Sequence, residues 1–123
     1  MISREQAEEL AYGWIDAFNR RDLDAVMARY ADDVQFSSPA VIEVAREPSG
    51  TIHGKDALRA YFDKGVAAYP ELGFELVHVL TGIESVTVVY RSLHRERIGA
   101  EVMVLDADGR IASVMVHYGP AAE

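Results

Sequence analysis

Apolar residues recur along this chain with two spacings, one typical of helices and one typical of strands. Between Ser3 and about Asn19 they recur every three or four positions, which predicts an amphipathic helix with one buried stripe. Ser3 and Gln6 have the spacing of a capping box, which marks the start of this helix. The stripe consists of Ala7, Leu10, Ala11, Trp14, Ala17 and Phe18.

The stretch from Arg21 to Pro39, RDLDAVMARYADDVQFSSP, organises the rest of the chain. Asp22 has the position of a helix N-cap and opens a short second helix. The buried stripe expected for that helix is Leu23, Val26, Met27 and Tyr30. Asp32-Asp33 predicts a turn, after which inward and outward positions alternate as in a strand. Its expected inward residues, which would line one wall of any cavity, are Val34, Phe36 and Ser38.

Residues 40–53 show neither period and are expected to be irregular. Val41, Ile42 and Val44 either extend the preceding strand or fold over the mouth of a cavity, and a loop of this length beside a pocket is often a lid. A third helix is predicted to begin near Lys55 and to end at Tyr69-Pro70, since the residue before a proline disfavours helix.

The remaining chain predicts four strands, at about 74–81, 85–94, 99–106 and 110–118. Asp106-Ala107-Asp108-Gly109 is a hairpin turn between the last two. Three helices followed by a run of antiparallel strands indicate an α+β fold, in which a curved antiparallel sheet wraps around the helices. A length of 123 residues predicts a single domain over residues 1–123.

Composition and charge narrow the function classes. The formal net charge of −8 argues against non-specific binding to nucleic acid, which depends on Lys and Arg. No apolar run is long enough to cross a membrane and no signal-peptide pattern is present, so we expect a cytoplasmic protein without membrane contact. The chain has no Cys, and its four His have no metal-ligand spacing, so neither a metal nor a cofactor is expected.

Several motifs resemble those of one superfamily. They are the D-L-D and A-D-D segments before a short strand and Pro39, then H-G-K-D-A-L-R-A-Y-F, and D-G-R-I in the last hairpin. In this order they resemble the nuclear transport factor two-like superfamily, and more narrowly its SnoaL-like and ketosteroid isomerase-like members. The resemblance implies a cone-shaped sheet around the helices, an apolar pocket at the open end, and a homodimer formed through the outer sheet face.

The resemblance also implies positions for the catalytic groups of a ketosteroid isomerase, and this chain departs from two of the three. The family's general base falls at Ser38, its oxyanion-hole tyrosine at Trp14, and its protonated aspartate at Glu101. A serine hydroxyl does not take a proton from carbon unaided, and an indole N–H is a weaker donor than a phenol. We therefore expect no classical ketosteroid isomerase activity.

Glu101 is the first candidate for chemistry because it shares a strand face with Met103 and Leu105. If this face points inward, burial raises the pKa of the carboxyl group and prepares it for acid or base catalysis near neutral pH. If it points outward, Glu101 pairs with Arg91 or Arg97 across strands. Whether Tyr90 or Arg91 points inward stays open, and an inward Arg91 would keep Glu101 charged.

The second candidate is Ser38, whose hydroxyl is better suited to orienting a ligand than to attacking one, since no His is adjacent. The candidate ligand-binding residues are Trp14, Phe36, His53, Phe62, Met103, Val114 and Tyr118. On the last strand the family's parity places Val114, Val116 and Tyr118 inward. It places Ile111, Met115 and His117 on the outer face, as part of the dimer contact.

These observations leave three readings open. The first is a cofactor-free isomerase, cyclase or dehydratase that acts by proton transfer through Glu101 on a small hydrophobic or carbonyl-bearing molecule. The second is a non-catalytic module that binds a small hydrophobic ligand. The third is a dimeric interaction module whose pocket is filled by its own side chains.

Overall fold

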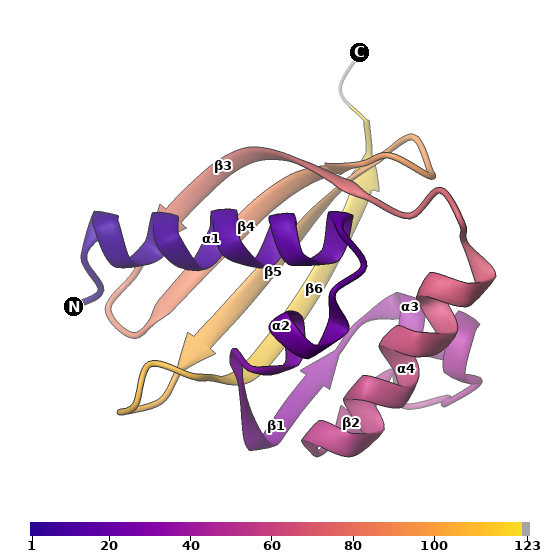
Figure 1. The fold of residues 1–123 in the computed structure, drawn as a ribbon, viewed down its shortest axis with the longest axis horizontal. Coiled ribbons are helices and arrows are strands. Elements are labelled where there is room, and N and C mark those ends of the chain that lie inside the picture. Colours follow the sequence, from indigo (N-terminus) through magenta and orange to yellow (C-terminus); the bar gives the residue numbers. More distant parts are fainter. Residues whose placement is uncertain (122–123) are drawn as a thin grey trace.

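The computed structural model describes residues 1–121, which form helices packed against a single curved sheet (Figure 1). The helices are α1 (Arg4–Asn19), α2 (Leu23–Met27), α3 (Pro39–Ala45) and α4 (Lys55–Ala68). Side chains cap the first two as predicted, since Ser3 accepts the Gln6 N–H and Asp22 accepts the Ala25 N–H. These caps satisfy backbone donors that a helix start leaves without partners.

Six strands form one mixed sheet in the order β2-β1-β6-β5-β4-β3. Their bounds are β1 (Tyr30–Ser37), β2 (Thr51–His53), β3 (Phe74–Thr81), β4 (Ser85–Ser92), β5 (Arg97–Leu105) and β6 (Ile111–Pro120). Strands β3 to β6 form the expected antiparallel meander, whereas β1 joins β6 in parallel and pairs with β2 antiparallel. The α+β fold predicted from the sequence is therefore confirmed.

The core lies between the inner sheet face and α1, which crosses in front of the meander (Figure 1). The apolar stripe predicted for α1 is buried, and Trp14 at its centre is 1 % exposed. Its ring stacks on Phe74 of β3, with ring centroids 5.5 Å apart. Aromatic packing thus joins α1 to β3, an edge strand of the sheet. The cavity lies toward the end of the molecule near α3 and α4.

The transition between α2 and β1 differs from the prediction. Strand β1 begins at Tyr30, so Asp32 and Asp33 lie within the strand instead of forming a turn. The pairing of β1 with β6 shifts its register between Tyr30 and Gln35, which accommodates these two exposed residues. The alternation after Asp33 is as predicted, with Val34 and Phe36 buried and Gln35 exposed.

The segment 40–53, predicted to be irregular, contains most of α3, a helix that the sequence did not predict. Ser38 is its N-cap and accepts the Ala40 N–H at 3.1 Å, while Pro39 occupies the first helical turn, where a missing N–H costs nothing. The β-branched residues Val41, Ile42 and Val44 hid this helix because they favour strands. Val41 is fully buried, and Ile42 is half exposed on the outside.

The prediction for Ile111 was wrong, since its side chain is fully buried instead of lying on the outer face. The reason is a register shift: Leu105 pairs with Ile111, but Val104 pairs with Ser113. The extra residue reverses the alternation at the start of β6. Beyond it the predicted parity holds, with Val114 and Val116 buried and Met115 and His117 exposed.

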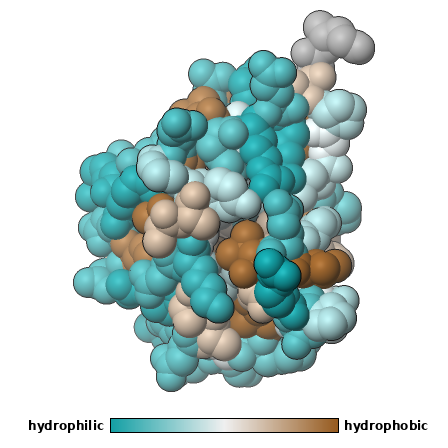
Figure 2. All heavy atoms as spheres, turned by 90° about the vertical axis from the view of Figure 1, so that its right-hand side faces the viewer, coloured by the Kyte–Doolittle hydropathy of each residue, from teal (hydrophilic) through white to brown (hydrophobic). Residues whose placement is uncertain are grey.

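Within residues 1–121, no helix is long and apolar enough to cross a membrane. Seen from the side where α3 and α4 lie in Figure 1, the surface is mostly hydrophilic, with separate hydrophobic groups between hydrophilic ones (Figure 2). The cavity that Glu101 lines lies at this end of the molecule.

Candidate functional site

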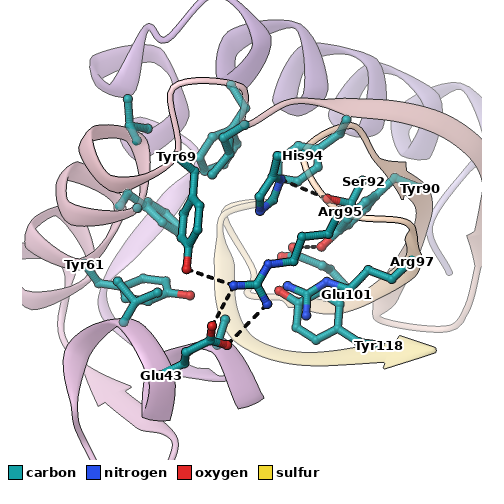
Figure 3. Close-up of a pocket in the computed structure, with 18 of the residues that line it drawn as sticks. Glu43, Tyr61, Tyr69, Tyr90, Ser92, His94, Arg95, Arg97, Glu101 and Tyr118 are labelled. Atoms are coloured by element: carbon teal, nitrogen blue, oxygen red, sulfur yellow. Dashed lines mark hydrogen bonds and ion pairs between the residues drawn. The ribbon is translucent and has the colours of Figure 1, made fainter. Parts of the chain in front are cut away.

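A cavity of about 70 Å³ lies between the inner face of β4 to β6 and the helices α3 and α4 (Figure 3). Aromatic rings from α1, β1, β3 and α4 form much of its wall: Trp14, Phe18, Phe36, Phe62 and Phe74. Its polar lining comes from the two helices, the β4–β5 connection and strands β4 to β6. These residues are Glu43, Tyr61, Tyr69, Tyr90, Ser92, His94, Arg95, Arg97, Glu101 and Tyr118.

Glu101 of β5 points inward and is only 4 % exposed. Its Oε2 accepts a hydrogen bond from the Tyr90 hydroxyl at 2.8 Å, while Oε1 has no hydrogen-bond partner within residues 1–121. Burial raises the pKa of Glu101 from 4.5 to about 7, against the smaller opposing effect of the Tyr90 hydrogen bond. Protonated and charged forms therefore coexist near neutral pH, which suits a group that both takes and gives a proton.

Tyr90 settles the question left open by the sequence. Its side chain is 1 % exposed on the inner face, whereas Arg91 points outward and pairs with Glu75 at 3.4 Å. Gly99, directly opposite on β5, makes room for the Tyr90 ring, because a Cβ there would lie 2.5 Å from the Tyr90 Cζ. The missing side chain lets the phenol lie over β5 and reach the carboxyl group of Glu101.

Ser38 is buried but does not line the cavity. Its Oγ caps α3, and the same hydroxyl opposes the effect of burial on the pKa of two phenols that do line the cavity, Tyr61 and Tyr118. Burial is the main cause of the raised pKa of both phenols. The structure thus makes Ser38 a neighbour of two cavity hydroxyls instead of a wall residue.

Three residues that line the cavity bond to one another across its rim, and we call Glu43, Tyr69 and Arg95 the mouth cluster (Figure 3). The Arg95 Nη2 donates to Glu43 Oε1 at 2.6 Å and to the Tyr69 hydroxyl at 2.8 Å. The Arg95 Nη1 donates to Glu43 Oε2 at 3.3 Å. The hydrogen bonds from Arg95 lower the pKa of Glu43, so its carboxylate stays charged. The mouth cluster links α3, the end of α4 and the β4–β5 connection.

His94 and Ser92 lie beside the mouth cluster. The Ser92 Oγ and His94 Nδ1 are 3.0 Å apart, and the His94 ring packs on Tyr69 with centroids 5.0 Å apart. Burial, followed by the charges of Arg95 and Arg97, lowers the pKa of His94. The imidazole is therefore neutral at neutral pH and adds no charge to the mouth.

Four of the predicted ligand-binding residues line the cavity: Trp14, Phe36, Phe62 and Tyr118. Trp14 does not offer its N–H to the cavity, however, because Nε1 donates to the Tyr30 hydroxyl at 2.9 Å. Trp14 therefore contributes an apolar wall and not a donor for an oxyanion.

The other three predicted ligand-binding residues lie elsewhere. His53 is exposed, because β2 pairs it with the outward Gln35 while its neighbour Ile52 pairs with the inward Phe36. Met103 and Val114 pair with each other and are 0 % and 1 % exposed. They share the face of Glu101 but lie deeper in the core, so they support the cavity without lining it.

Sequence reasoning did not single out Gly99, the mouth cluster or Arg97 as a cavity residue. A weak signal for Gly99 existed, since a glycine inside a strand often marks a close approach of another group. Nothing in the sequence indicated the mouth cluster, whose members come from segments far apart in the chain. Within residues 1–121, no three His, Asp or Glu side chains lie close enough together to bind a metal ion.

Comparison with known proteins identifies the family. The family model described as the SnoaL-like domain matches residues 11–116. A SnoaL-like protein of unknown function from Burkholderia thailandensis is 36 % identical, with 96 % of this chain and 98 % of that chain covered and a TM-score of 0.91. No curated protein matches this chain.

More distant structures show the same fold. A candidate ketosteroid isomerase from Kribbella flavida is 21 % identical over 97 % of this chain and 82 % of that chain, with a TM-score of 0.74. A candidate isomerase of the SnoaL-like family from Agrobacterium tumefaciens is 17 % identical over 94 % and 95 % of the two chains, with a TM-score of 0.69. The sheet order, the helices on its inner face and the match over residues 11–116 lead to one conclusion: this chain belongs to the SnoaL-like family.

Proposed function

We propose that this protein is a cofactor-independent enzyme that moves a proton at a carbon atom of a small hydrophobic, carbonyl-bearing molecule. An isomerisation, a cyclisation or a dehydration would proceed by such a step. The observation that carries this proposal is Glu101, a buried carboxyl group on the cavity wall with one oxygen unpaired within residues 1–121. Its pKa of about 7 supports a role as both base and acid.

In this mechanism the charged Glu101 takes a proton from a carbon next to the ligand's carbonyl group. The electron pair of the broken C–H bond forms a C=C bond to the carbonyl carbon, and the π electrons of the C=O bond move onto the oxygen. The protonated Glu101 then returns the proton to a different atom, and the C=O bond forms again as the electrons move back. Tyr90 fixes the carboxyl group through its 2.8 Å hydrogen bond. Tyr118, whose raised pKa keeps the phenol protonated, is the cavity donor proposed for the oxygen on which charge develops.

The size of the cavity limits the ligand. Drug-sized ligands occupy pockets of about 300–1,000 Å³, so about 70 Å³ holds only a few non-hydrogen atoms while the mouth cluster is closed. A steroid does not fit this space. A larger substrate requires the mouth cluster to separate.

Hydrogen–deuterium exchange tests the proposal without knowledge of the substrate. Small enolisable ketones, such as acetone, cyclohexanone and acetophenone, are incubated with the protein in D₂O, and loss of the α-proton signal is followed by NMR. We expect enzyme-dependent exchange that rises with pH through about 7, because the charged Glu101 is the base. Glu101→Gln should lower the rate at least about hundredfold, and Glu101→Asp should restore part of it.

Glu75→Gln is the matched control, since Glu75 is an exposed carboxylate on the neighbouring sheet edge. It should leave exchange unchanged. Equal rates in wild type and Glu101→Gln would remove Glu101 from the mechanism. Ligand-dependent thermal stabilisation without exchange would favour the non-catalytic binding module instead, and the absence of both would favour an interaction module.

We also propose that the outer sheet face forms a homodimer contact. Support comes from a row of directly paired residues on that face, Leu80, Thr87, Val102 and Met115, two of which are exposed apolar side chains. A monomer rarely exposes a large apolar patch. A molar mass of one chain in sedimentation equilibrium would contradict this contact.

A further inference from the structure

Two arginines line the cavity, Arg95 and Arg97, and within residues 1–121 only Arg95 has a carboxylate partner. Arg95 makes a two-pronged contact with Glu43 at 2.6 and 3.3 Å, so its charge is matched within the mouth cluster. Arg97, two residues further along, has no salt bridge to any residue from 1 to 121. With His94 neutral, Arg97 is the one cavity-lining cation that lacks a matched carboxylate in the described chain.

The Arg97 side chain is fixed by stacking on Tyr118 and is therefore positioned to bind a ligand. Its guanidinium lies over the Tyr118 ring, with Cζ 3.6 Å from the ring centroid (Figure 3). Its Nε is buried and has no hydrogen-bond partner within residues 1–121. A buried donor on a charged group costs stability unless something accepts its hydrogen bond. The stacking on Tyr118 fixes the guanidinium plane and leaves its donors available to a ligand.

The second unpartnered group of the cavity lies on the same strand. Glu101 is 4 % exposed and its Oε1 is unpaired within residues 1–121. Residues 97 and 101 are four positions apart on one strand face, about 13 Å along the backbone. Gly99 between them has no side chain, and the Tyr90 ring covers it. The cavity therefore has a cation at Arg97 and a carboxyl group at Glu101, and Tyr90 and Tyr118, which both pair with Gly99, lie between them.

We propose that Arg97 binds a carboxylate of the ligand, so that the substrates of this site are small carbonyl compounds that carry one carboxylate at the end away from Glu101. This inference names the ligand class of the site described under Proposed function, and it rests on that proposal only for the role of the cavity. The guanidinium supplies the fork of N–H donors that a carboxylate accepts, while the reacting carbon faces Glu101.

The charges at the site favour a carboxylate over a phosphate. One cation without a partner in residues 1–121 balances one negative charge, whereas a phosphate at neutral pH carries about 1.5 to 2 negative charges. Glu43 at the mouth and the charged form of Glu101 would both repel the second charge. The formal net charge of −8 also disfavours the approach of anions to this protein. Binding of a carboxylate therefore depends on the local positive charge of Arg97.

Matched pairs of probes test this inference. Acetate and acetamide, and benzoate and benzamide, have the same shapes but differ in charge, and inorganic phosphate is the competing anion. Affinities are measured by NMR titration, with the Arg97 Nε–Hε signal as the reporter. We expect each carboxylate to bind at least about tenfold more tightly than its amide and to shift the Arg97 signal. Phosphate should not shift it.

Variants separate the role of Arg97 from general electrostatics. Arg97→Gln should remove the preference for carboxylate over amide, and Arg97→Lys should restore part of it. Arg91→Gln is the matched control, because Arg91 lies on the adjacent strand, points outward and pairs with Glu75. It should leave the preference unchanged. The Arg97 signal of the wild-type protein gives the same answer without a variant if Arg97→Gln does not fold.

Three results would overturn the inference: equal affinity for carboxylate and amide, an unshifted Arg97 signal with both carboxylates, or a preference that survives in Arg97→Gln. Tighter binding of phosphate than of either carboxylate would also contradict it. Glu101→Gln distinguishes this inference from the proposed function, because it should abolish proton exchange and keep the preference for carboxylate. A protein that prefers carboxylates but never exchanges a proton would refute the proposed function alone.

Discussion

Replacing Glu101 with Gln should stabilise the folded protein, and the gain should grow with pH. In the folded state burial raises the pKa of this carboxyl group from 4.5 to about 7. Between these values the folded chain keeps a proton that the unfolded chain releases. Folding therefore loses stability as the pH rises from about 4.5 to about 7, and the full penalty is present above the folded pKa. Gln has no charge to bury and removes this penalty.

The size of the effect follows from the shift in pKa. Each pKa unit corresponds to about 1.4 kcal/mol, so the buried charge costs roughly 3 kcal/mol at about pH 8 and almost nothing at about pH 4. The quantity to compare is the stability difference between Glu101→Gln and wild type at each pH. The substitution also alters the hydrogen bond to Tyr90, but that effect is the same at every pH. The change of the stability difference with pH therefore reports the titration of Glu101 alone.

Urea denaturation at several pH values between about 4 and 8 measures this difference, with the slope m checked for two-state behaviour. Glu75→Gln, which removes one exposed carboxylate, should change stability by less than about 0.5 kcal/mol at every pH. A stability difference for Glu101→Gln that is the same at both ends of the range would refute the reasoning. It would mean that Glu101 titrates in the folded protein as it does in the unfolded chain.

Two further predictions concern the surroundings of Glu101. Gly99→Ala should displace the Tyr90 ring, because the added Cβ would lie 2.5 Å from Tyr90 Cζ, and thermal denaturation should show a loss of about 1–3 kcal/mol. Gly119→Ala should be close to neutral, because an added Cβ there has no atom of residues 1–121 within 4 Å. Equal melting temperatures for the two variants would contradict this packing. Glu43→Gln should weaken the hydrogen bonding between residue 43 and Arg95, so stopped-flow measurements should show faster ligand association. The free energy of unfolding should change by less than about 1 kcal/mol. Unchanged association rates would show that the mouth cluster does not limit entry.

The elements with a strong period could be predicted from the sequence alone. The α1 stripe, the capping residues Ser3 and Asp22, and β3 at Phe74–Thr81 agree with the structure. The spacing of Glu101 to Met103 also predicted that the two share a strand face, although only the structure shows that this face points inward. These features depend on local spacing, which a single sequence contains.

Features that depend on register or on distant contacts could not be predicted. The shift between Val104 and Leu105 buries Ile111, and no local signal in β6 marks it. The Ser38-Pro39 start of α3 was hidden by the β-branched residues that follow it. The site itself needed the cross-strand register, because only the structure brings Tyr90 to Glu101 and shows which arginine faces the cavity.

The central claim is that Glu101 is a carboxyl group poised between its two protonation states in a buried cavity. A ¹³C NMR titration of the glutamate side-chain carboxyl signals tests it most directly, with the Glu101 signal assigned by its absence in Glu101→Gln. The account predicts a titration midpoint of about 7 for this signal. A midpoint near 4.5 would show a solvated carboxylate and would contradict both the stability prediction and the proposed role in proton transfer.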